Sequence, residues 1–249
     1  ALGAERCDIH TDVDGVYTCD PRIVPNARKL PEISYDEMLE MASSGTKVMQ
    51  SRSVEFAKKY GVVFEVCSSL NDNPGTLVTE EHPAMEAVVI RGVSIERSQA
   101  RVTITDIPDT PGNSGKILGC LAEAEINVDM IVSNIASDGM ARHSFTMHTN
   151  DLGRAQAALK PVLGILSEDA KIETEAALAK LSTVGIGMRS HSGVAAKMFK
   201  ALGEANINIG MISTSEIKIS VTVNETDIED AARVVHEAFE LDKKPEASA

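Results

Sequence analysis

Two stretches of this sequence, 81 positions apart, repeat one another. Residues 112–131 read GNSGKILGCLAEAEINVDMI, and residues 193–212 read GVAAKMFKALGEANINIGMI. Nine of the twenty aligned positions are identical, including an Ile-Asn and a Met-Ile pair in matching places. Self-similarity at a fixed offset indicates a duplicated structural unit. We therefore expect the second part of the chain to contain two copies of one unit.

Strand and helix patterns follow the same order around both stretches. The first copy is predicted to contain strand, helix, strand, strand and helix at 100–105, 112–124, 128–136, 142–149 and 152–166, with a closing strand at 171–174. The second copy has the same order at 180–185, 193–205, 209–214, 217–223 and 228–239. This is the βαββαβ order of a ferredoxin-like fold.

The second copy needs a closing strand from elsewhere, because the tail after Phe239 is too polar for a core strand. Met85–Ile90 is a hydrophobic stretch without a partner in its own neighbourhood. We therefore predict that it forms a strand in the sheet of the second copy, and that the first copy is inserted between. The predicted boundaries are 98–175 for the first copy, 84–97 plus 176–243 for the second, and 244–249 for a disordered tail.

Residues 1–80 alternate strand and helix patterns and are expected to form a separate α/β domain. Ser34 and Glu37 have the spacing of a capping box, which predicts a helix over Tyr35–Ser43. A second helix is predicted from Lys47 to Lys59 and a buried strand at Val62–Val66.

Composition excludes several classes of protein. Of 249 residues, 24 are Lys or Arg and 37 are Asp or Glu, giving a net charge of −13. Such an acidic chain is repelled by phosphate backbones and anionic lipid, so neither nucleic acid nor membrane is an expected partner. The four cysteines form no C-x-x-C pair and the six histidines have no metal-ligand spacing, so we expect no metal site and a reducing, cytoplasmic location.

The run TDVDGVYTCDPR at 11–22 is the most informative segment of the first domain. Gly15 and Pro21 shape turns that leave backbone N–H groups free, Arg22 is suited to a phosphate, and Tyr17 is suited to stacking on a base. An ordinary acidic surface turn is the alternative. Lys47 could hold an anion at a helix N-terminus, and a solvated lysine is the alternative there.

Equivalent loops of the two copies, 109–114 and 190–195, each lie between a strand and a helix N-terminus. Free N–H groups there can bind a carboxylate, and a neighbouring acidic side chain can bind an ammonium group. The two together would suit a free amino acid. Plain helix capping is the alternative. Residues 132–134 and 213–216 add polar groups at a strand end, unless they only complete a hairpin turn.

Residues 11–22 resemble the nucleotide-binding segment of aspartokinases, and RKLPEISYDEMLEM (28–41) and KVMQSRSVE (47–55) continue the match. The duplicated units resemble the paired ACT domains of the same family, especially in GMRSHSGVA (187–195) and MISTSEI (211–217). The resemblance covers essentially the whole chain. It implies an α/β (α+β) fold, with part of an amino-acid-kinase domain followed by two ferredoxin-like ACT domains, the first inserted into the second.

The resemblance implies transfer of the γ-phosphoryl group of ATP to aspartate, giving 4-phospho-L-aspartate and ADP, with Mg²⁺ as the metal of the nucleotide. This is the first step towards lysine, threonine and methionine. The implied ATP-site residues are Thr11, Asp12, Tyr17, Arg22, Lys47 and Val48.

The ACT domains are implied to bind lysine, threonine or both as inhibitory effectors, and to pair into a homodimer. A catalytic aspartokinase subunit is a further candidate partner. The effector-site residues are expected to be Asp109, Gly112, Asn113, Ser114, Asn127, Asp129, Ser133, Val194, Ala195, Asn208, Ile209, Ser215 and Glu216.

The family's catalytic motifs, of Lys-Phe-Gly-Gly, Phe-Glu-Arg and Gly-Gly-Ser-Asp type, do not occur in these 249 residues. We therefore expect no catalytic residue in this chain, and no turnover of aspartate by this chain alone. The alternative is a non-catalytic, amino-acid-sensing regulatory subunit of an aspartokinase. A stand-alone ACT protein of another pathway is a third hypothesis.

Overall fold

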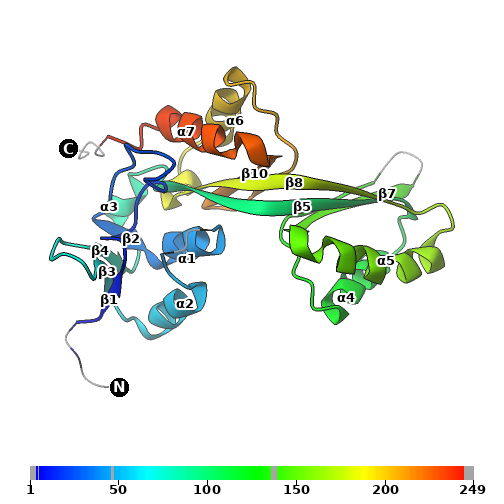
Figure 1. Ribbon diagram of the computed structural model, residues 1–249, viewed down its shortest axis with the longest axis horizontal. Coiled ribbons are helices and arrows are strands. Elements are labelled where there is room, and N and C mark those ends of the chain that lie inside the picture. The colour runs from blue at the N-terminus through cyan, green and yellow to red at the C-terminus, as the bar shows by residue number, and fades with distance from the viewer. Residues whose placement is uncertain (1–3, 5, 46–47, 136–138, 244–249) are drawn as a thin grey trace. The chain divides into compact units, whose positions relative to one another are not determined.

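The computed structural model describes residues 4, 6–45, 48–135 and 139–243 (Figure 1). The predictions for Lys47 and for the tail 244–249 concern residues outside this set. The chain forms two compact units. Unit 1 comprises 1–96, 180–223 and 227–249, and unit 2 comprises 97–179 and 224–226.

Unit 1 begins with a four-stranded sheet whose helices α1 (Tyr35–Ser43) and α2 (Ser51–Tyr60) pack on each other. The first strand is parallel to its neighbour, the middle pair is antiparallel, and the last pair is parallel. In sheet order the strands are β1 (Asp8–Thr11), β3 (Phe64–Ser68), β4 (Thr76–Thr79) and β2 (Glu32–Ser34).

The capping box at the start of α1 is confirmed. The Ser34 hydroxyl accepts a hydrogen bond from the Glu37 N–H, and the Glu37 carboxylate accepts one from the Ser34 N–H. Helix α2 begins at Ser51, later than predicted, and ends at Tyr60, where Gly61 caps it in the left-handed conformation. A short helix, α3 (Pro83–Glu86), follows the sheet.

The rest of unit 1 is the second copy of the duplicated unit. Figure 1 shows helices α6 and α7 together on one side of β10, and the two helices pack on each other. Its elements are the end of β8 (Lys171–Val184), the 3₁₀ turn η2 (Ile186–Arg189), α6 (Val194–Glu204), β9 (Ile212–Thr214), β10 (Lys218–Asn224) and α7 (Ile228–Ala238). The 3₁₀ turn η3 (Glu225–Asp227) connects β10 to α7, and its first two residues are grouped with unit 2.

Unit 2 is the first copy, with helices α4 and α5 packed together on one face of its strands (Figure 1). Val102 of β5 faces Phe145 of β7 in the antiparallel register, and both side chains are fully buried. Its elements are the second part of β5 (Gly92–Pro108), α4 (Asn113–Glu123), β6 (Ile131–Ile135), β7 (Met140–His148), η1 (Thr149–Asp151), α5 (Leu152–Leu166) and the first part of β8.

The two copies share backbone details that the sequence alone could not show. Gly112 and Gly193 precede α4 and α6 with φ of 95° and 87°. In the first copy the Met130 N–H donates to the Thr146 hydroxyl over 3.1 Å. In the second copy the Met211 N–H donates to the Thr222 hydroxyl over 2.7 Å. Matching dihedral angles and matching hydrogen bonds support a duplication.

Two strand predictions are wrong. Met85–Ile90 is not a strand, because Pro83 begins the helical turn α3 and the strand starts only at Gly92. The strands predicted at 171–174 and 180–185 are one strand, β8. Its middle contains Ala177 at a φ of 57°, an irregularity that interrupts the apolar alternation without ending the strand.

A buried ion pair connects three segments of unit 1. The Glu37 side chain is fully buried and lies 3.4 Å from Nε of Arg91, which is 5% exposed. The same carboxylate accepts the N–H of Ile186 over 3.1 Å. Arg91 also donates from its guanidinium to Met85 O and from its backbone to Val184 O. Helix α1, the segment before β5 and the turn after β8 therefore meet at one carboxylate.

We expect Arg91→Met to lower the free energy of unfolding by about 3–5 kcal/mol, because it leaves the buried Glu37 carboxylate without its cation. The matched control is Lys58→Met, which removes the cation of the half-exposed Lys58–Asp36 pair and is expected to cost less than about 1 kcal/mol. Thermal unfolding of both variants measures the difference. Equal midpoints for the two variants would contradict a structural role for the buried pair.

Candidate functional site

The segment 11–22 begins where two parallel strands end side by side. Thr11 and Ser68 are register partners at the ends of β1 and β3. The Thr11 carbonyl accepts the N–H and the hydroxyl of Ser69, at 2.8 and 2.9 Å, and its own hydroxyl donates to Val13 O over 2.8 Å. The carboxyl ends of parallel strands are where open α/β sheets bind ligands. Thr11 is therefore fixed at a position suited to ligand contact.

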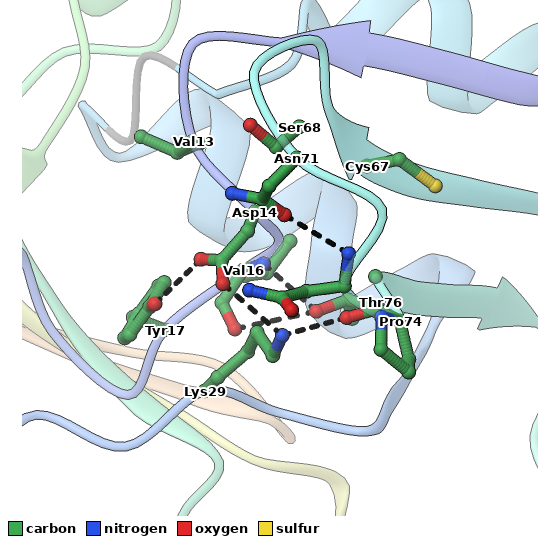
Figure 2. A network of polar contacts seen from close by, with 12 residues as sticks. Val13, Asp14, Val16, Tyr17, Lys29, Cys67, Ser68, Asn71, Pro74 and Thr76 are labelled. Atoms are coloured by element: carbon green, nitrogen blue, oxygen red, sulfur yellow. Dashed lines mark hydrogen bonds and ion pairs between the residues drawn. The ribbon is translucent and has the colours of Figure 1, made fainter.

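Asp14 organises the next part of the loop (Figure 2). The Tyr17 hydroxyl donates to its carboxylate over 2.6 Å, and Lys29 Nζ lies 3.3 Å away. The Tyr17 hydrogen bond is the main cause that lowers the pKa of Asp14, and the same bond raises the pKa of Tyr17 to about 12. At neutral pH the carboxylate is therefore ionised and the phenol is protonated, which fixes the tyrosine ring.

Gly15 allows this loop to approach β4 closely. Its φ is 144°, and a Cβ at this position would lie 2.6 Å from the Thr76 hydroxyl oxygen. That hydroxyl accepts the N–H of Val16 over 2.8 Å and donates to Leu30 O over 2.6 Å (Figure 2). This one buried threonine side chain thus fixes the backbone of the loop against β4.

The end of the loop presents a cation to solvent. The Asp20 carboxylate accepts the backbone N–H of Arg22 over 2.9 Å and pairs with its guanidinium at 2.7 Å. The Arg22 hydrogen bond lowers the pKa of Asp20. Asp20 accepts from Nε and Nη2 of the guanidinium. Because the Arg22 side chain is 85% exposed, the rest of the guanidinium remains accessible to an anion.

The structure places four of the six predicted nucleotide-site residues, namely Thr11, Asp12, Tyr17 and Arg22, on this one loop. Asp12 is exposed, and Val48 lies elsewhere, half-buried against the core of unit 1. Lys47 lies outside the described residues. Tyr17 and Arg22 are held by different carboxylates, so their ring and guanidinium are fixed separately.

Sequence reasoning missed Lys29, Pro74 and Thr76. Lys29 donates from Nζ to Pro74 O over 2.6 Å, and with Pro74 it borders an open hollow of about 750 Å³. No local signal identifies these residues, because Lys29 lies 15 positions from Asp14 and Thr76 lies 60 from Val16. The hollow is lined by Arg28, Lys29, Pro31, Glu65, Pro74, Gly75 and Leu77.

In unit 2, most of the predicted effector residues are exposed around the start of α4 and the approach to β6. Asn113 is the exception, because it is buried and its amide donates to Pro108 O over 3.0 Å. Its side chain therefore holds the loop. The exposed members of the set are Asp109, Gly112, Ser114, Asn127, Asp129 and Ser133.

In unit 1, the corresponding residues lie at the start of α6, between α6 and β9, and in the β9–β10 turn. Ser215 is partly used by the turn itself, since its N–H donates to Lys218 O over 2.8 Å. Glu216 is 84% exposed and lies 3.6 Å from Nε of Arg189. Asn208 is exposed, Ile209 and Ala195 are half-buried, and Val194 is buried.

A further cluster brings Asp8, Glu65 and Cys67 within reach of one ion. Arg6 pairs with both carboxylates, at 2.5 and 2.8 Å, and Glu65 also accepts the N–H of Gly75. One guanidinium therefore compensates part of the charge of the two carboxylates and occupies an oxygen of each, and we assign the cluster no metal. Among the described helices, none is long and apolar enough to cross a membrane.

Two family models match the chain. Residues 1–68 match the amino acid kinase family, and residues 181–239 match an ACT domain. The chain thus combines an amino-acid-kinase segment with an ACT regulatory region.

The chain is 51% identical over 245 residues to the aspartokinase of Pseudomonas aeruginosa. The aligned region covers 97% of this chain and 59% of that protein. The chain is 36% identical to the regulatory subunit of aspartate kinase from Thermus thermophilus, covering 61% of this chain and 99% of that subunit, with a TM-score of 0.57. Two structures of E. coli aspartokinase III, at 28% identity, have TM-scores of 0.77 and 0.73. They cover 95% and 96% of this chain, and 53% and 52% of theirs.

This chain belongs to the aspartokinase family. It spans about three-fifths of the length of the P. aeruginosa relative.

The cysteines offer a direct test of how the loop is packed. Cys19 is 3% exposed, and burial raises its pKa to about 12, whereas Cys7 is exposed. Since the thiolate is the reactive form, we expect an excess of Ellman's reagent at pH 8 to label Cys7 rapidly and Cys19 only after unfolding. Peptide mass spectrometry of the labelled protein distinguishes the two. Equal labelling rates in native buffer would show that the 11–22 loop is not packed as described.

Proposed function

We propose that this chain is the part of an aspartokinase that completes the nucleotide site and carries the amino-acid effector sites. The reaction transfers the γ-phosphoryl group of ATP to the side-chain carboxylate of L-aspartate, giving 4-phospho-L-aspartate and ADP. The observation that carries the proposal is the 11–22 loop, anchored at the ends of two parallel strands with Arg22 exposed. One of the E. coli aspartokinase III structures contains aspartate and ADP.

The chemistry of this loop fits a nucleotide carrying Mg²⁺. Arg22 supplies a guanidinium for phosphate oxygens, and the ring of Tyr17, fixed by Asp14, offers a flat face to a base. Asp12 is an exposed carboxylate at the same loop, suited to a hydroxyl or to a metal-bound water. Thr11, Lys47 and Val48 complete the proposed nucleotide site. The residues that perform the chemical step are proposed to lie outside this chain.

The duplicated units are proposed to be two ACT domains, one at 98–175 and the other at 84–97 plus 176–243, with lysine, threonine or both as effectors. One structure of E. coli aspartokinase III contains lysine and aspartate. Exposed Asp109 and Ser114 at the start of α4, and the exposed amides of Asn127 and Asn208 before β6 and β9, supply hydrogen-bonding groups of the kind that a free amino acid requires.

We propose that the chain forms a homodimer through its ACT domains and acts in the cytoplasm. Strands β6 and β9 are the outermost strands of their sheet. Ile135 on β6 is 62% exposed and Ile212 on β9 is 43% exposed. An edge strand with exposed isoleucines is suited to pairing with another copy.

The second candidate is a non-catalytic sensing subunit that acts on a catalytic aspartokinase partner. It is favoured by the match to nearly the whole T. thermophilus regulatory subunit. That match covers only 61% of this chain, however, and a pure sensor does not require the 11–22 loop. Nucleotide binding through this loop separates the two candidates.

We expect Arg22→Ala, in the protein as its gene encodes it, to weaken ATP or ADP binding by about 10- to 100-fold, because a charge-assisted hydrogen bond to phosphate is lost. The matched control is Arg154→Ala, which removes another exposed arginine paired with a nearby aspartate. Calorimetry measures nucleotide binding, and trapping of the acyl phosphate with hydroxylamine measures turnover. Unchanged nucleotide affinity in the Arg22 variant would exclude the proposed phosphate contact.

Effector binding can be tested on the two copies separately. We expect lysine, threonine or their mixture to raise the thermal midpoint of the unmodified protein, since a ligand at 100 times its Kd stabilises by about 2.7 kcal/mol. Asn127→Ala and Asn208→Ala remove equivalent exposed amides from the two copies. Whichever copy binds the effector is expected to lose the shift when its asparagine is removed. A full shift in the double variant would show that these amides are not effector ligands.

A further inference from the structure

A buried histidine on the last helix contacts the middle of the nucleotide loop. His236 of α7 is 1% exposed, and its Nε2 lies 2.9 Å from the hydroxyl oxygen of Thr18. Thr18 is fully buried and follows Tyr17 directly. The two residues are 218 positions apart in the sequence. The proposed nucleotide loop is therefore tied to a helix of the second duplicated copy.

The polar atoms of Thr18 are satisfied on every side. Its backbone N–H donates to Arg28 O and its carbonyl accepts the N–H of Val93, at 2.9 and 2.7 Å. Its hydroxyl oxygen accepts the N–H of Arg28 over 2.9 Å, so the hydroxyl proton is free to be donated to His236 Nε2. Burial lowers the pKa of His236, which favours the neutral imidazole that this arrangement needs.

Two more contacts join the same elements. Arg233 of α7 donates from Nε to Ile23 O over 3.0 Å, just after the loop. Arg28 donates from Nε to the carbonyl of Lys243, beyond the end of α7, over 3.2 Å. Glu229 and Asp230, one turn earlier on α7, pair with Arg233 and orient it. Helix α7 and the residues after it therefore contact Thr18 within the Tyr17–Arg22 segment, and Ile23 and Arg28 in the chain that follows it.

Helix α7 is also connected to the proposed effector residues. It packs on α6, whose first turn contains Val194 and Ala195. Lys197 of the same helix places its ammonium 5.0 Å from the ring centre of Phe239, at the end of α7. Helix α6, which begins with these residues, is therefore in contact with α7, and α7 is in contact with Thr18.

We propose that His236 is a positioning residue of the nucleotide site, which holds Thr18 so that Tyr17 and Arg22 face the nucleotide and which transmits the state of helices α6 and α7 to that loop. This inference rests on the proposed function. His236 does not contact the nucleotide itself. Its role is to fix the backbone between the two side chains that do.

The test compares His236→Leu, which removes the hydrogen bond, with His236→Gln, which keeps a polar atom near the Nε2 position. In the protein as its gene encodes it, we expect His236→Leu to raise the KM for ATP by about three- to tenfold, with the KM for aspartate unchanged. It is also expected to raise the lysine or threonine concentration needed for half-maximal inhibition. His236→Gln is expected to restore both values towards those of the unmodified protein.

Thr18→Val removes the partner hydroxyl and provides a second route if His236→Leu folds poorly. Thr222→Val is its matched control, because it removes another buried hydroxyl that accepts a backbone N–H, away from the loop. We expect Thr18→Val to raise the KM for ATP and Thr222→Val to lower stability without that effect. The Thr18 and His236 effects are expected to be non-additive in the double variant.

Nucleotide binding by the unmodified protein is measured first, by calorimetry with ADP. If it does not bind nucleotide, the proposed function fails and this inference fails with it. If it binds and folded His236→Leu or Thr18→Val has an unchanged KM for ATP, the positioning role alone is overturned. Equal loss in His236→Leu and His236→Gln would likewise contradict a role for the hydrogen bond.

Discussion

A single buried carboxylate, that of Glu37, constrains the arrangement of unit 1. A charge removed from water must be compensated, and here Arg91, the cap of α1 and the N–H of Ile186 share that task. The backbone around it is tightly packed, since a Cβ on Gly185 would lie 2.3 Å from Val89 O. Val184, at the end of β8, belongs to the same hydrophobic cluster as the residues around α1. The kinase-like sheet and the second copy are therefore built around a common interior.

The order of the 11–22 loop, the proposed nucleotide loop, follows from this shared interior. Its first half is held on the sheet by Thr76 and fixed internally by the Asp14–Tyr17 hydrogen bond, and its second half depends on Thr18, Arg28 and α7. A loop that depended on its own turns alone would sample many conformations. Here the free energy of ordering is supplied by packing of the whole unit, so the exposed Arg22 is presented from a fixed base.

Local signals in the sequence predicted the elements that local interactions determine. The Ser34–Glu37 capping box predicted the start of α1, and the repeat predicted the helices of both copies. The same signals could not show that Glu37 also pairs with Arg91, 54 positions away, because that contact is tertiary. The strand predicted at Met85–Ile90 failed for a related reason. A short apolar run fits a strand or a helical turn equally well, and Pro83 decides between them. The resemblance implied most of the proposed nucleotide-site residues on one segment, but the sequence could not show the partners of that segment on β4 and α7.

The duplication also records which backbone positions have been free to change. Gly112 and Gly193 adopt φ of 95° and 87°, a region that side chains with a Cβ rarely tolerate, and both copies retain glycine. Glu125 and Asn206 adopt φ of 54° and 56°, within the left-handed region that other residues can occupy at a modest cost. There the copies have diverged. Comparing the two copies therefore shows that the residue type is kept where the backbone conformation requires glycine, and has changed where other residues can adopt the conformation.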